Sequence, residues 1–196
     1  TLLTPMLLDL TDESTLGAIR SIAAVGMIVA SLIIGVFNMK GSHLTYITCF
    51  LAAGGVLIFF LGTTTSIVAI GVLAFAFFMT LPPLNTSIEV ITRSSIPNET
   101  QGKVWGLMGL ISQLGYVVAY AVSGVLADSV FNPLLREGGA LADSLGALIG
   151  VGTSRGIGFM LMIVGVLLIG MAVAIPRARS IRSLQNNLSL TKKKDA

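Results

Sequence analysis

The sequence contains few charged residues and almost none of the residue types that build metal or disulfide sites. Only 11% of its 196 residues are Asp, Glu, Lys or Arg, against roughly 25% in soluble domains. The single cysteine, Cys49, excludes an internal disulfide framework, and the single histidine, His43, has no neighbouring ligands. We find no paired acids, metal cluster or activated nucleophile, so we expect no enzyme, metal or cofactor.

Apolar residues take the place of the missing charge. They make up 54% of the chain, and the mean hydropathy is +0.92, which indicates an integral membrane protein whose first partner is the lipid bilayer. The apolar runs are near 20 residues long, which fits membrane-spanning helices and not the shorter alternating strands of a barrel. The net charge of +3 accompanies no nucleic-acid-binding motif, so no nucleic acid is expected as a partner.

The apolar pattern predicts one partial helix and five complete spans within residues 1–176. The start of the chain lacks a basic stretch and a cleavage site, so we expect a fragment in which residues 1–10 form the end of a helix. The segment 145–151 is too short to cross and is expected at the membrane interface. Residues 177–196 are expected to form a basic tail. The five spans are 15–37, 44–61, 66–92, 103–127 and 155–175.

The basic residues are distributed unequally between the two predicted sides of the membrane. Nine of the twelve lie on the side of the C-terminal tail, and only Arg20, Arg136 and Arg155 lie on the other. Because cytoplasmic segments carry the excess of Lys and Arg, we expect a multi-pass protein of the inner (plasma) membrane with a cytoplasmic C-terminus.

The predicted span 66–92 carries the clearest functional signal. Pro82 and Pro83 are expected to break its helix, since each removes a backbone donor and clashes with the preceding turn. Beyond them Asn85 and Glu89 share one helical face. A carboxylate at membrane depth points to a substrate or proton site, whereas Arg93, four residues later, offers a purely structural ion pair. The sequence leaves both interpretations of Glu89 open.

A second polar stripe lies on the predicted span 103–127, where Gln113, Tyr116 and Tyr120 recur at three- and four-residue steps. This stripe is expected either to face the first one across a cavity or to pack between helices, since both residue types hold membrane helices together. Arg20 has a similar pair of interpretations, as a residue that extends to the interface or as a ligand contact inside a cavity.

Three stretches of the chain resemble the C-terminal half of a major facilitator superfamily transporter, of the drug, macrolide and siderophore exporter type. They are Pro97-Asn98-Glu99-Thr100-Gln101-Gly102-Lys103-Val104, Ser123-Gly124-Val125-Leu126-Ala127-Asp128 and Gly150-Val151-Gly152-Thr153-Ser154-Arg155-Gly156-Ile157-Gly158. Their order and spacing extend over nearly the whole chain. The resemblance implies an all-α integral membrane fold, the C-terminal six-helix half of the transporter with its first helix truncated.

The resemblance also implies a function and a set of site residues. It implies efflux of a small, largely hydrophobic molecule by proton antiport and alternating access, with the N-terminal half of the same transporter as partner. The cavity-lining residues would be Pro82, Pro83, Asn85, Glu89, Gln113 and Tyr116, with Glu89 as the candidate for proton coupling. Lys40, Gln101, Gly102 and Lys103 would belong to gating loops. The competing interpretation is a membrane scaffold or assembly subunit without a transport cycle.

Overall fold

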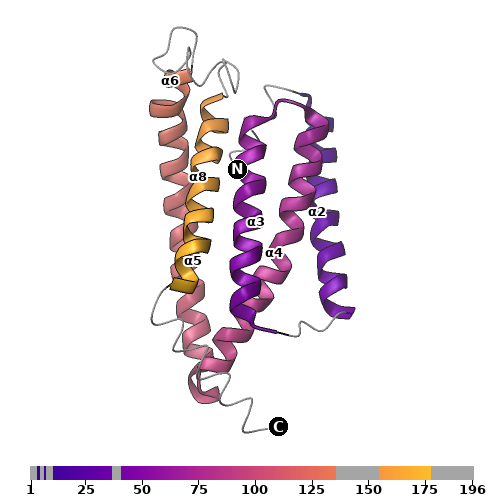
Figure 1. Cartoon of the computed structure of the whole chain (residues 1–196). Coiled ribbons are helices and arrows are strands. Elements are labelled where there is room, and N and C mark those ends of the chain that lie inside the picture. The colour runs from indigo at the N-terminus through magenta and orange to yellow at the C-terminus, as the bar shows by residue number, and fades with distance from the viewer. Residues whose placement is uncertain (1–3, 5–6, 8–10, 37–40, 136–154, 178–196) are drawn as a thin grey trace.

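The computed structural model describes residues 4, 7, 11–36, 41–135 and 155–177, and every element in these ranges is a helix (Figure 1). Five helices are long and apolar enough to cross a membrane, so the chain is a multi-pass α-helical membrane protein. They are α2 (Glu13–Val36), α3 (His43–Thr63), α4 (Ile67–Ser95), α5 (Asn98–Leu126) and α8 (Arg155–Ala174). Large apolar side chains are exposed on all five, as expected of surfaces that face lipid.

The fourth helical segment differs most from its predicted span of 103–127. Helix α5 begins at Asn98 and continues through a π-helical turn, η1 (Ala127–Phe131), into the short helix α6 (Asn132–Leu135). Residues 128–135, which follow the predicted span, are therefore helical. The predicted interfacial piece at 145–151 lies outside the described residues.

Asp12, the residue before α2, accepts side-chain hydrogen bonds from the first turn of the helix. The Asp12 carboxylate accepts hydrogen bonds from the hydroxyls of Ser14 and Thr15, the second at 2.6 Å. These bonds favour the ionised form and lower the pKa of Asp12 well below its usual range. A negative charge at this position also complements the positive end of the helix dipole.

Four of the helices form a row in the order α2, α4, α3, α8, in which each helix packs on the next (Figure 1). The main core lies between α2, α3 and α4. It comprises Leu7, Leu16, Ile19, Ala23, Leu61, Ile70 and Ala74. A smaller cluster joins the end of the α5 segment to α8 and comprises Ala127, Ile157 and Met160. The row is therefore held by apolar packing along the helix axes.

Helices α3 and α8 approach each other closely because glycine faces glycine at two levels. A Cβ atom added to Gly158 would lie 2.6 Å from the carbonyl oxygen of Gly62, and one added to Gly165 would lie 2.6 Å from that of Gly55. The two glycines of each helix are seven residues apart, so both face the partner helix. Small residues of this kind let membrane helices pack backbone to backbone.

Pro82 and Pro83 lie inside α4, which runs without a break from Ile67 to Ser95. The expected interruption is therefore wrong. Membrane helices tolerate proline where neighbouring helices and polar side chains satisfy the freed backbone groups. Pro83 is buried, and Thr80, also buried, donates to the carbonyl oxygen of Phe77 at 2.7 Å one turn before the prolines.

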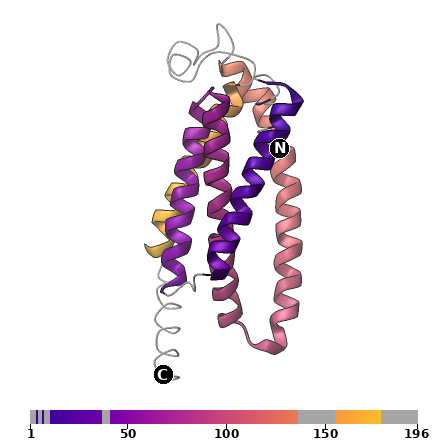
Figure 2. The ribbon, with the colours of Figure 1, turned by 90° about the vertical axis from the view of Figure 1, so that its right-hand side faces the viewer.

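Helix α5 is the exception to the compact packing, because none of its residues is buried. At one end, the two residues Ile96 and Pro97 join it to α4. At the other end, η1 and α6 contact α8, and Gly156 of α8 lies against the backbone of Phe131 and Asn132. Figure 2 shows α5 standing beside the row and attached to it mainly at its two ends.

Candidate functional site

The turn between α4 and α5 is organised by one side chain, that of Gln101. Its Nε2 donates to the carbonyl oxygens of Arg93 and Ile96, each at 3.3 Å, and to Asn98 Oδ1 at 3.1 Å. The last carbonyl groups of a helix have no partner within the helix, so Gln101 supplies the missing donor for α4 from the first turns of α5. The two helices are thus joined by side-chain hydrogen bonds as well as by the chain.

This geometry corrects the predicted gating loop. Gln101, Gly102 and Lys103 belong to the beginning of α5 and not to a loop. Among the described residues, a Cβ added to Gly102 would meet no atom within 4 Å outside its own helix backbone, and Lys103 is exposed. Lys40, the fourth predicted gating residue, lies outside the described residues. Of the four predicted gating residues, only Gln101 is shown to link two helices.

Glu89 and Arg93 form the ion pair that their four-residue spacing predicts. The distance between Glu89 Oε2 and Arg93 Nη2 is 3.8 Å, with both side chains more than half exposed. The Arg93 guanidinium also lies 6.0 Å from the centre of the Trp105 ring on α5, near the limit for a cation–π contact. Glu89, Arg93, Gln101 and Trp105 together form what we call the α4–α5 junction.

The length of α4 places the junction near a membrane surface. At about 1.5 Å per residue its 29 residues extend about 43 Å, whereas the hydrocarbon core is about 30 Å thick. The last turns of α4, which carry Glu89 and Arg93, therefore extend toward the headgroups. Trp105 suits the same depth, because its ring is amphipathic.

Asn85 and Gln113 lie at the same depth, on two different helices. Arg93 and Trp105 face each other at the junction, and the chain runs in opposite directions along α4 and α5 (Figure 2). Asn85 is eight residues from Arg93, and Gln113 is eight residues from Trp105, so both lie about 12 Å beyond the junction toward the membrane centre. Both side chains are exposed. We call Asn85 and Gln113 the amide level.

Tyr116 and Tyr120 continue the polar stripe of α5 beyond Gln113. Their rings stack with centres 6.4 Å apart and an angle of 19° between the ring planes, and both are more than half exposed. Among the described residues, no hydrogen bond or ring contact joins Asn85 with the α5 stripe. The structure thus brings the two stripes to a common depth without packing one against the other.

The remaining candidate residues from the sequence are Arg20 and the two prolines of α4, Pro82 and Pro83. Arg20 is exposed on α2, and its Nη2 donates to Thr4 Oγ1 at 2.6 Å, so within the described residues it contacts the preceding segment. Pro82 is partly buried and Pro83 is buried within α4, which makes Pro83 a packing residue of the row. The described part of the chain contains no cluster of metal-ligating residues.

Two features of this region were not predicted from the sequence. One is the capping role of Gln101, which its position five residues after Ile96 and just inside a helix start could have suggested. The other is Ser87, which is fully buried with no hydrogen-bond partner for its hydroxyl in the described residues. Ser87 follows Pro83 by one turn on the buried face of α4, a spacing that was available in the sequence.

Comparison of the chain with protein-family models, with curated proteins and with solved structures finds no match.

Proposed function

We propose that the chain is one half of a secondary active transporter, in which a second helical half covers the amide level and closes a central cavity. The observation behind the proposal is the exposure of Asn85, Gln113, Tyr116 and Tyr120 at membrane depth. An unpartnered amide in hydrocarbon is costly, and polar residues inside membranes usually face a bundle interior or a water-filled cavity. The exposed stripe of α5 therefore suits a surface that another body covers.

The resemblance to the major facilitator superfamily supplies the finer parts of the proposal. They are proton-coupled efflux of a small, largely hydrophobic molecule by alternating access, and a location in the inner (plasma) membrane. Exposed basic residues near the junction and the end of α8, namely Arg93, Lys103 and Arg177, support placing this end in the cytoplasm. Glu89 is the proposed proton-coupling residue, because it is the carboxylate nearest to the amide level on α4.

The proposal predicts that residues 1–196 alone do not transport, because the site is formed between two halves. Vesicles containing only this chain are expected to accumulate no lipophilic drug or siderophore when a pH gradient is imposed. Vesicles containing the chain together with its proposed other half are expected to do so. The measurement is uptake of a panel of labelled compounds, with empty vesicles as the control.

Two outcomes would contradict this proposal. Uptake by residues 1–196 alone would show that no second half is needed. Absence of uptake by the two-half protein across the panel, with correct insertion, would favour the alternative of a membrane scaffold or assembly subunit. In that alternative the same exposed stripe on α5 packs against a partner without leaving a water-filled space.

A further inference from the structure

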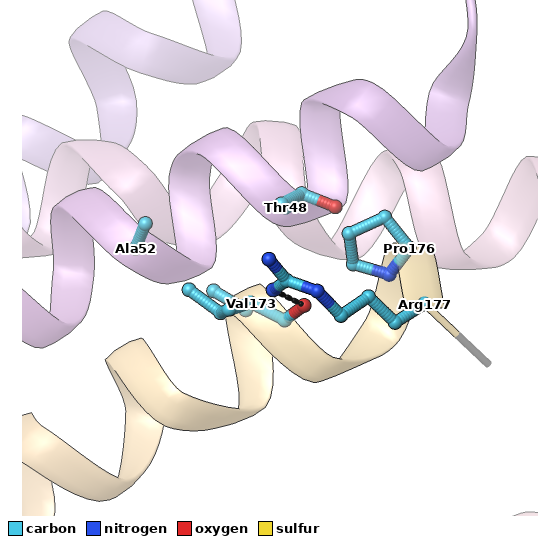
Figure 3. Close-up of a pocket in the computed structure, with 6 residues that line it drawn as sticks. Thr48, Ala52, Val173, Pro176 and Arg177 are labelled. Atoms are coloured by element: carbon cyan, nitrogen blue, oxygen red, sulfur yellow. Dashed lines mark hydrogen bonds between the residues drawn. The ribbon is translucent and has the colours of Figure 1, made fainter.

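A groove at the end of α8 lies outside the proposed transport site. It has a volume of about 470 Å³ and is open to the surroundings. Its walls come from the first half of α3, from α8 and from the 3-10 turn η2 (Ile175–Arg177) that ends the span (Figure 3). The lining residues are Thr48, Ala52, Ala172, Val173, Pro176 and Arg177.

The chemistry of the groove changes along its length. Arg177 lies at the end of the helix, and its Nη1 donates to the carbonyl oxygen of Val173 at 3.0 Å. A guanidinium has five N–H donors, and among the described residues this bond to Val173 is the one that Arg177 makes. Ala52 lies one turn beyond Thr48 on α3, and Ala172 lies five residues before Arg177 on α8, so the two alanines lie about 6–8 Å farther along the helix axes. One end of the groove is thus cationic and the other is apolar.

The groove opens where small side chains leave space between the two helices. Ala52 and Ala172 present only methyl groups, and Ala172 is buried at the base. The hydroxyl of Thr48 already donates to the carbonyl oxygen of Leu44 at 2.9 Å, so it places no unsatisfied donor in the groove. Figure 3 shows the Arg177 side chain extending back from the end of α8 to Val173, between α8 and the α3 wall.

We infer that this groove binds an anionic phospholipid of the surrounding bilayer, with its phosphate at Arg177 and an acyl chain along Ala52 and Ala172. The groove is cationic at the membrane surface and apolar toward the bilayer centre. A phospholipid in the same leaflet places its headgroup and its acyl chains in this order. Basic pockets between membrane helices bind anionic headgroups in this way. The acidic residues described near this end, Glu89 and Glu99, do not line the groove, so within the described part of the chain no carboxylate lines the place proposed for a phosphate.

The test compares binding of phosphatidylglycerol and phosphatidylcholine with identical acyl chains to residues 1–196 in neutral detergent. Retained lipid is counted by native mass spectrometry. The wild-type chain is expected to prefer phosphatidylglycerol. Arg177→Gln is expected to weaken phosphatidylglycerol binding about fivefold, the effect of one basic residue near an anionic surface. Ala52→Leu fills the apolar part and is expected to weaken binding of both lipids.

Two control variants distinguish binding in this groove from diffuse attraction between basic side chains and anionic lipid. Arg177→Lys keeps the positive charge and is expected to retain the preference for phosphatidylglycerol, whereas Lys103→Gln removes an exposed charge on α5 and is expected to change nothing. Equal losses in Lys103→Gln and Arg177→Gln would show diffuse attraction and overturn the proposal. Unchanged binding in Ala52→Leu would also overturn it, and Ala52→Val is the milder replacement if that variant fails to fold.

Discussion

Glu89→Gln in the two-half protein is expected to reduce substrate uptake driven by a pH gradient to the level of empty vesicles. Glutamine keeps the size and hydrogen-bonding ability of the side chain but cannot bind and release a proton. Exposed i,i+4 ion pairs contribute only about 0.3–0.5 kcal/mol, and Glu89 and Arg93 are both more than half exposed. A large loss of transport would therefore reflect the missing carboxylate and not a loss of folding.

The matched control is Glu99→Gln, which removes an exposed carboxylate from the first turn of α5 without touching the ion pair. It is expected to leave uptake unchanged. Normal uptake by Glu89→Gln, with wild-type dependence on the pH gradient, would show that Glu89 serves only as the structural partner of Arg93. The proton-coupling group would then have to lie elsewhere in the two-half protein.

Gly158→Leu is expected to produce a larger loss of stability than any other substitution proposed for this chain. Its Cβ would lie 2.6 Å from the carbonyl oxygen of Gly62, so α3 and α8 must separate to admit the side chain. The obstacle is backbone and cannot rotate away. Overpacking of a tight core costs about 1–3 kcal/mol and sometimes more, and separation of the helices would also weaken the second glycine contact, between Gly55 and Gly165.

The control for this substitution lies on the same helix. Within the described part of the chain, a Cβ added to Gly170 would meet no atom within 4 Å outside its own helix backbone, so Gly170→Leu is expected to leave the thermal unfolding midpoint in detergent near that of the wild type. Gly158→Leu is expected to lower the midpoint sharply. Similar midpoints for the two variants would contradict the close α3–α8 contact.

Hydropathy predicts the existence of the helices well, because the penalty for exposing backbone in hydrocarbon leaves a membrane chain few alternatives. It predicts their ends less well. Helix α5 extends beyond the apolar run in both directions, since the Gln101 side chain completes the turn at one end and packing against α8 supports η1 and α6 at the other. Both ends depend on contacts between different segments of the chain, and local hydropathy does not predict such contacts.

The two prolines and the glycines show a second limit of the sequence. Pro82 and Pro83 indicate an interrupted helix when read locally, but the continuous α4 depends on its neighbours in the row. In the same way, the sequence shows many glycines at helical spacing, while only the fold selects Gly55, Gly62, Gly158 and Gly165 as the contact between α3 and α8. A Cβ added to Gly35, on an exposed face of α2, would meet no described atom within 4 Å apart from its own helix backbone.

For the candidate site, the sequence predicted the Glu89–Arg93 pair from its spacing and identified both polar stripes. It left open whether the two stripes lie at a common depth. The common depth depends on the short turn at Ile96 and Pro97 and on the contact between Arg93 and Trp105. These two features set the register of α4 against α5. The role of the stripes in transport stays a prediction.

The most direct test of the central claim is the reaction of cysteines at the amide level with a membrane-impermeant thiol reagent. Cys49, which is exposed on α3, is first replaced by alanine. Three variants of this protein are then labelled in membranes containing the two-half protein. They are Asn85→Cys, Gln113→Cys and the control Ile28→Cys on the outer face of α2. We predict that Asn85→Cys and Gln113→Cys react and are protected by substrate, while Ile28→Cys, in contact with lipid, does not react. If the two amide-level cysteines are as unreactive as Ile28→Cys, no water-filled cavity exists at this depth, and the transporter proposal is contradicted.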